Sequence, residues 1–104
     1  MAFDKTRERY ASFSIATSLP HQIIDTFWDL LDNYLKGVVP LDDVLTFHLV
    51  NHRDNLRFRY MDSEHEIVID FDYKTPFDPF YPETVHVVDD LGIETILLPH
   101  EFDL

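Results

Sequence analysis

The chain has 104 residues, of which 45% are hydrophobic, with no cysteine and with 20 acidic against 8 basic side chains, a formal charge of −12. This composition is typical of one globular domain, and the lack of cysteine excludes disulfides, thiol redox chemistry and zinc–thiolate sites. The charge repels nucleic-acid phosphates and anionic membranes, and no apolar run approaches the roughly 20 residues of a membrane span. We therefore expect a cytoplasmic protein that binds neither.

A short strand is predicted near the start of the chain. Residues 1–9 alternate in charge and lack the apolar region of a signal peptide, so we expect them to form a mobile arm. Residues 10–16, YASFSIA, follow as a strand that places Ala11, Phe13 and Ile15 on one face.

One long helix is predicted over residues 18–37. Ser18 is its expected N-cap, Pro20 lies in its first turn, and Gly37 closes it in the left-handed conformation. The spacing of apolar residues predicts a broad face packed on the sheet, so we expect Trp28 to be buried. That face consists of Ile23, Ile24, Phe27, Trp28, Leu31, Tyr34 and Leu35.

Three antiparallel strands are expected next, at residues 44–50, 56–61 and 66–73. With loops at 51–54 and 62–65, the pairing sets Phe47 opposite Phe58 and Phe58 opposite Ile69. Every inward residue is then apolar, and a slip of one residue would turn this set outward. The outward face carries one polar row, which is either a solvated surface or a small site: His48, Arg57 and Asp70.

The remaining chain predicts a loop and a hairpin. Residues 74–82 hold three prolines, which cannot donate ladder hydrogen bonds. Strands at 83–88 and 93–98 surround a turn that contains Gly92, and their register stays open. Residues 99–104 are expected to form a loose tail.

The predicted fold is α+β, with one long helix packed on a mostly antiparallel sheet of five or six strands. The order is a strand, the helix and then the meander, and residues 1–104 form a single domain. Strands 10–16 and 44–50 would be parallel if adjacent, through a right-handed crossover.

The pair Asp70 and Asp72 is the main candidate for chemistry. On a strand the two carboxylates point to one face about 6.8 Å apart, and hard cations often use such ligands. The predicted neighbour Arg57 would compete with a metal, however, so we expect neither a metal nor a cofactor. The histidines form no metal motif, and the chain has no GxSxG elbow or phosphate-binding glycine loop. No catalytic residue is therefore assigned.

Residues 9–50 resemble small Firmicute proteins grouped as a staphylococcal domain of unknown function. The shared features are a strand opening in "RY", a helix around a central tryptophan, and an aspartate-led strand ending in "F-x-L". Here these are Arg9, Tyr10, Trp28, Asp43, Phe47 and Leu49. The resemblance implies a bacterial or mobile-element setting, and it implies no activity.

The charge distribution leads to the functional hypothesis. Residues 1–59 hold eight acidic and seven basic side chains, whereas residues 60–104 hold twelve acidic side chains and one base, Lys74. A field this one-sided attracts basic partners, although it can also serve solubility alone. We expect a non-enzymatic binding or regulatory protein whose acidic half engages a basic protein surface.

The expected binding residues are Asp70, Asp72, Asp78 and Glu83. A sharper form of the hypothesis is nucleic-acid mimicry, in which ordered carboxylates imitate phosphates and occupy a DNA-binding protein. The alternative from another class is a small metal-dependent hydrolase that uses Asp70, Asp72 and His48.

Overall fold

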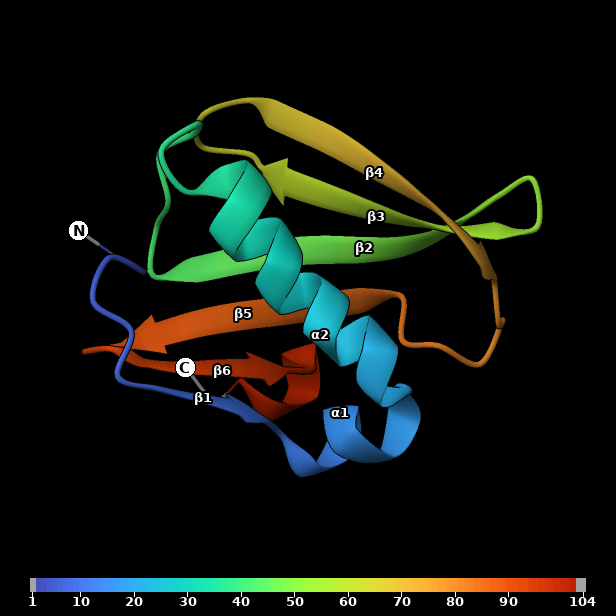
Figure 1. Cartoon of the computed structure of the whole chain (residues 1–104), viewed down its shortest axis with the longest axis horizontal. Helices are drawn as coiled ribbons and strands as arrows, with labels where there is room; N and C mark the ends of the chain where they lie inside the picture. Colours follow the sequence, from blue (N-terminus) through green and yellow to red (C-terminus); the bar gives the residue numbers. More distant parts are fainter. Residues whose placement is uncertain (1, 103–104) are drawn as a thin grey trace.

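The computed structural model describes residues 2–102, which form a six-stranded mixed sheet with helices across one face (Figure 1). The sheet order is β1-β6-β5-β2-β3-β4, with β1 parallel to β6 and the other neighbours antiparallel. The strands are β1 (Glu8–Ala11), β2 (Val44–His52), β3 (Asn55–Asp62), β4 (Ile67–Pro76), β5 (Thr84–Asp90) and β6 (Ile93–Leu97). The helical segments are α1 (Phe13–Ser18), α2 (His21–Leu30), the π-helical η1 (Leu31–Leu35) and the 3₁₀ turn η2 (Pro99–Glu101). Among the described residues, no helix combines the length and apolarity needed to cross a bilayer.

The core lies between α2 and the inner face of the sheet. The Phe27 ring meets the rings of Phe47 and Phe58 edge-on, with centroids 5.2 and 5.0 Å away. All three side chains are fully buried. Trp28, which we expected in the core, is only partly buried at its margin.

The predicted fold, one long helix on a mostly antiparallel sheet in the order strand, helix and meander, is wrong. The helix is broken, the sheet is mixed with β1 parallel to β6, and only the broad α+β class remains. The helix is broken before Pro20, so α2 has 10 residues and η1 adds 5. Proline forces the preceding residue out of the helical region, and Leu19 is extended at φ −122° and ψ 139°. Ser18 therefore ends α1, and Pro20 stands at the N-cap of α2.

The strand predicted at residues 10–16 is also wrong. β1 ends at Ala11, and α1 begins after Ser12, whose Oγ accepts a hydrogen bond of 3.2 Å from the Ile15 amide. Phe13 is 82% exposed whereas Ile15 is fully buried, so their apparent alternation does not mark one strand face. Because β1 pairs in parallel with β6, the expected crossover to residues 44–50 does not form.

The three-strand meander is present, but its register differs from the prediction by two residues. Phe47 faces Tyr60, and Phe58 faces Phe71. The cause at the first turn is a two-residue connection, Arg53 and Asp54, where we expected four residues. Both have positive φ, at 54° and 69°, as a tight hairpin requires. A shift of two preserves the parity of the strands, so Phe47 and Phe58 still point inward.

The N-terminal residues pack against the sheet, where we expected a mobile arm. Phe3 is fully buried, and its amide donates a hydrogen bond of 2.8 Å to Asp89. Burial of one aromatic side chain is enough to favour this placement over exposure to solvent. In the expected tail, Phe102 is partly buried near the His86 ring, and residues 103–104 lie outside the described residues.

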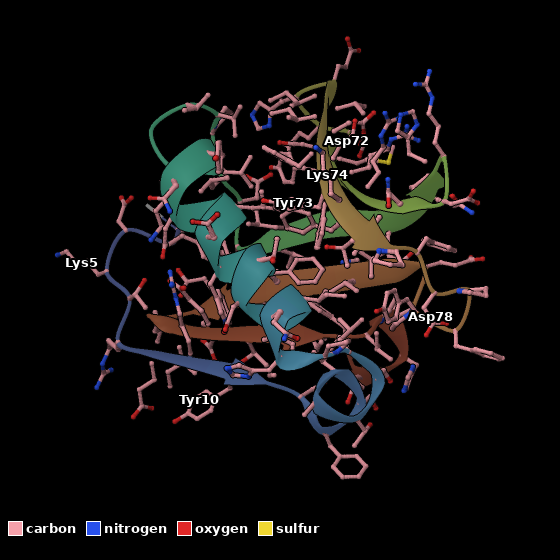
Figure 2. All side chains as sticks on the ribbon, turned by 45° about the vertical axis from the view of Figure 1, so that its right-hand side comes forward. Lys5, Tyr10, Asp72, Tyr73, Lys74 and Asp78 are labelled. Atoms are coloured by element: carbon pink, nitrogen blue, oxygen red, sulfur yellow. The ribbon has the colours of Figure 1, made fainter. Side chains whose placement is uncertain are left out.

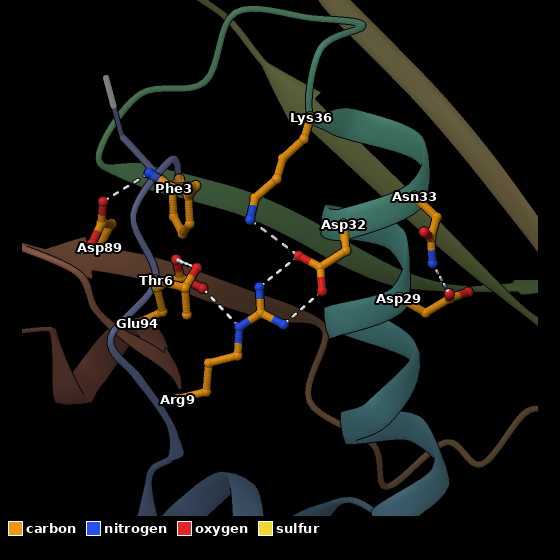
Figure 3. Close-up of polar contacts among 9 residues, drawn as sticks. All are labelled: Phe3, Thr6, Arg9, Asp29, Asp32, Asn33, Lys36, Asp89 and Glu94. Atoms are coloured by element: carbon orange, nitrogen blue, oxygen red, sulfur yellow. Dashed lines mark hydrogen bonds and ion pairs between the residues drawn. The ribbon is translucent and has the colours of Figure 1, made fainter.

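A polar network joins β1, β6 and η1 (Figure 3). Arg9 donates from Nε to fully buried Glu94 at 2.9 Å and from its two terminal nitrogens to Asp32 at 2.7 and 2.6 Å. Thr6 donates to the other Glu94 oxygen at 2.6 Å, and Lys36 pairs with Asp32 at 3.1 Å. The hydrogen bonds from Arg9 hold the pKa of Asp32 below its usual value.

The replacement Arg9→Gln should lower the unfolding free energy by about 3–5 kcal/mol, because it leaves the buried Glu94 carboxylate without a charged partner. The double variant Arg9→Gln/Glu94→Gln should recover most of that loss, since no buried charge remains. Urea unfolding of the wild type, both single variants and the double variant measures the coupling. Additive losses would show that the two side chains stabilise the fold independently.

Alanine at Gly92 should destabilise the protein more than alanine at Gly37. Both glycines have positive φ, which disfavours alanine by about 1–2 kcal/mol. At Gly92 a Cβ would also lie 2.6 Å from the Lys5 carbonyl oxygen, whereas at Gly37 it would meet nothing within 4 Å. Urea unfolding of the two variants compares the costs, and equal losses would contradict the close contact with Lys5.

Candidate functional site

The predicted site residues Asp70 and Asp72 lie on the outer face of β4, and arginines of β3 bind both. Arg59 holds Asp70 through two hydrogen bonds of 2.8 and 3.2 Å, and Arg57 holds Asp72 at 2.6 and 3.1 Å. Arg57 also approaches Asp70 at 3.3 Å. These arginines keep the pKa of each carboxyl below its ordinary value. The two aspartates are thus charged, and their charge is balanced locally.

The polar row on this face differs from the predicted one. His48 pairs with Arg59 across β2 and β3, and Arg59 pairs with Asp70, so Arg59 stands where we expected Arg57. The shift of register by two residues causes this exchange. The His48 ring contacts the Thr84 hydroxyl at 3.2 Å, and Arg59 lies between this ring and the aspartate.

Asp78 and Glu83 lie away from this aspartate pair. Asp78 is in the loop after β4, where its side chain accepts a hydrogen bond of 2.9 Å from the Phe80 amide; Figure 2 shows it apart from Asp72. Glu83 borders a shallow groove together with His48 and Arg59. The four predicted residues therefore do not form one site.

A different group of carboxylates gathers at one edge of the sheet. β2 and β4 begin at this edge, and β3 and β5 end there, on the left in Figure 1. The hydrogen bond from the Asp89 amide to the Asp43 carbonyl, 2.8 Å, joins two of its segments. We call this region the acidic end. It comprises Asp42, Asp43, Asp62, Glu64, Glu66, Asp89 and Asp90.

The most compact part of the acidic end surrounds the turn between β3 and β4. One ligand atom each from Asp42, Glu64 and His65 lies within 4.8 Å of the others. The Asp62 carboxylate accepts a hydrogen bond of 2.7 Å from His65 Nδ1. It also accepts hydrogen bonds of 3.1 and 3.2 Å from the backbone amides of Glu64 and His65. Carboxylate and imidazole groups in this arrangement can bind a cation or a basic side chain.

A polar cavity of about 160 Å³ adjoins this group, and Tyr60, Asp42, Asp62 and Glu64 contribute to its lining. Tyr60 is 1% exposed, yet its hydroxyl makes no hydrogen bond with any of residues 2–102. Burial, aided by the charges of Asp62 and Asp42, raises the pKa of Tyr60 to about 12. The hydroxyl therefore keeps its proton and can donate it to a group in the cavity.

Sequence reasoning missed this group. The Asp62-x-x-His65 spacing within a turn was an available signal, because such a turn can bring the two side chains together. Asp42 could not be included, because its proximity depends on the register of β2, β3 and β4.

Comparison with known proteins places the chain in a family. A family described as staphylococcal protein of unknown function (DUF960) matches residues 8–101. The chain belongs to the DUF960 family. This confirms the resemblance seen over residues 9–50 and extends it through the acidic half.

One similar solved structure is the crystal structure of a protein of unknown function from Enterococcus faecalis. It is 36% identical to this chain, with a TM-score of 0.94, and the match covers 100% of this chain and 98% of that one. No curated protein matches the sequence significantly. These similarities establish the family and give no activity for DUF960.

The pKa of His65 should lie above its ordinary value of 6.5, because Asp62 accepts its ring hydrogen bond and the charges of Asp42 and Glu64 add to the effect, although burial opposes it. NMR titration should show a lower pKa for His65 in Asp62→Asn and no change in the neighbouring variant Asp43→Asn.

The same pairing predicts how His65 contributes to stability. A raised folded-state pKa stabilises the protein below the unfolded-state value, and this stabilisation is lost as the pH rises through the folded-state value. The unfolding free energy lost in His65→Gln should therefore be larger at about pH 5.5 than at about pH 8. Equal losses at the two pH values would contradict the pairing.

Proposed function

We propose that this protein is a non-enzymatic binding protein that engages a basic protein surface through its acidic end. The supporting observation is a set of exposed carboxylates that form no ion pair with a lysine or arginine among residues 2–102. The set is Asp42, Asp43, Glu64, Glu66 and Asp90. Lys5 and Arg7 lie beside this set at Asp43, where they line a hollow together with Asp43, Asp89 and Gly92.

This surface differs from the one expected from the sequence. Because Arg57 and Arg59 already bind Asp72 and Asp70, those carboxylates would have to release an arginine to bind a partner. A bidentate arginine pair resists such exchange. We therefore place the interface at the acidic end, where carboxylates are available without that cost.

The other hypotheses gain no support from this geometry. Nucleic-acid mimicry requires ordered strand carboxylates that present net charge, and the charge of Asp70 and Asp72 is balanced by arginine. A hydrolase built on these aspartates and His48 would need a cation where guanidinium groups already lie. We propose the cytoplasm as the compartment, since a chain without cysteine does not depend on an oxidising one.

The proposed surface can be tested by neutralising three of its charges. The variant Asp43→Asn/Glu66→Gln/Asp90→Asn should fail to retain a basic protein that the wild type captures from an Enterococcus faecalis lysate at low salt. Buffers contain EDTA, so that divalent cations make no contribution. Surface plasmon resonance with the purified partner should show a lower association rate for this variant, because charges at an interface rim act mainly on encounter.

The matched control is Asp25→Asn/Asp29→Asn/Asp54→Asn, which removes the same charge from exposed positions outside the acidic end. Its association rate should stay close to that of the wild type at each salt concentration. Raising the salt should weaken wild-type binding, since the Debye length is only about 8 Å at physiological ionic strength. Equal losses in both variants, or capture of a partner without a basic surface, would contradict the proposal.

A further inference from the structure

We infer that Asp42, Glu64 and His65 bind one divalent cation of the zinc class, with Tyr60 directed at the bound ion or its water. This inference concerns the small cavity beside the turn between β3 and β4. It goes beyond the proposed function and does not depend on it, because the cation is a ligand in its own right.

The three donor atoms are close enough to enclose an ion after a small adjustment. Zinc binds nitrogen and oxygen ligands at about 2.0–2.2 Å, so donors around a tetrahedral ion lie about 3.4 Å apart. The donor atoms here lie within 4.8 Å of one another, and all three side chains are exposed. Exposed side chains can close such a difference by changing rotamer, without movement of the backbone.

Asp62 prepares His65 for this role. It accepts the hydrogen bond at His65 Nδ1, so Nε2 is the ring nitrogen left for an ion. Its own side chain is 8% exposed, and the backbone amides of the turn fix it in place. A carboxylate that orients a histidine in this way is the usual partner of metal-binding imidazoles.

Tyr60 supplies an independent observation. Its side chain is 1% exposed, and its hydroxyl has no hydrogen-bond partner within the described part of the chain. No side-chain oxygen or nitrogen among those residues is both unpaired and sealed from solvent, so the hydroxyl reaches the cavity that Asp42, Asp62 and Glu64 line. A hydroxyl that opens into a polar cavity without a protein partner bonds to water or to a ligand there. A water on the cation would take that place.

The donor set indicates the class of cation. Magnesium and calcium prefer sites made of oxygen ligands alone, whereas imidazole favours zinc and other first-row transition metals. One imidazole and two carboxylates leave a fourth tetrahedral position for water. We therefore expect zinc to bind more tightly than magnesium.

The test is isothermal titration calorimetry of the full chain without an affinity tag, with zinc chloride alone as the probe. Wild type should bind one equivalent of zinc. Each of Asp42→Asn, Glu64→Gln and His65→Gln should weaken binding at least about tenfold, and Tyr60→Phe about tenfold, as losses at metal ligands and their supporting groups do. Amide NMR spectra of the zinc-free variants establish that each is folded.

The matched controls are Asp43→Asn and Glu66→Gln, each of which removes one charge beside a proposed ligand. Both should bind zinc within about twofold of the wild type, because neither residue belongs to the donor group. If zinc binding were weakened equally in the ligand variants and the control variants, the proposed site would be overturned, because only the total negative charge would then matter. Three results with the wild type would also overturn the site. The protein could fail to bind zinc, it could bind magnesium as tightly as zinc, or NMR spectra could place the zinc at another histidine.

Discussion

The ion pair between Arg9 and the buried Glu94 constrains the rest of the structure. A carboxylate that is fully buried requires a charged partner, and Arg9 of β1 is placed to supply it on β6. The same guanidinium holds Asp32 of η1, and it lies 4.7 Å from the centre of the Trp28 ring. The Arg9 side chain thus links the edge strand β1 to β6, contacts the C-terminal end of the helix at Asp32, and covers the Trp28 ring. Trp28 accordingly packs against the core on one side and carries the Arg9 guanidinium over its ring.

The inward faces of the strands were predictable from the sequence, and the register was not. The inward or outward direction of a side chain in β2 and β3 depends only on whether its position is odd or even, so Phe47 and Phe58 were correctly placed inside. The length of the turn at Arg53 and Asp54 decides the pairing, and neither residue is a glycine that would have marked a tight turn. The break before Pro20 has a local cause, but proline is also common in the first turn of a helix, so the apolar period alone does not reveal the break. The parallel pairing of β1 with β6 joins distant parts of the chain and leaves no local pattern to detect.

The candidate site depends on the same information about register. The excess of acidic residues in 60–104 suggested an acidic surface on β4. The distribution of charge along the sequence, however, differs from its distribution over the folded surface. Arg57 and Arg59 belong to the balanced half of the sequence, yet the meander brings them onto Asp70 and Asp72. The sheet topology meanwhile brings Asp42, the turn at Asp62–Glu66 and the end of β5 together at the acidic end. Acidic residues of both halves therefore form the available surface, and no single stretch of sequence contains it.

The pairing of β1 with β6 also has a consequence for biosynthesis. Residues 8–11 are synthesised well before their partners, residues 93–96. At about 5–20 residues per second, the first strand waits about 4–17 s for the strand it pairs with. During that interval Phe3 and the Arg9 side chain have no completed sheet to join, whereas the hairpin of β2 and β3 can form as soon as it emerges. The nascent chain must therefore keep β1 available until β6 has emerged, and β1 is the last strand that can join the sheet.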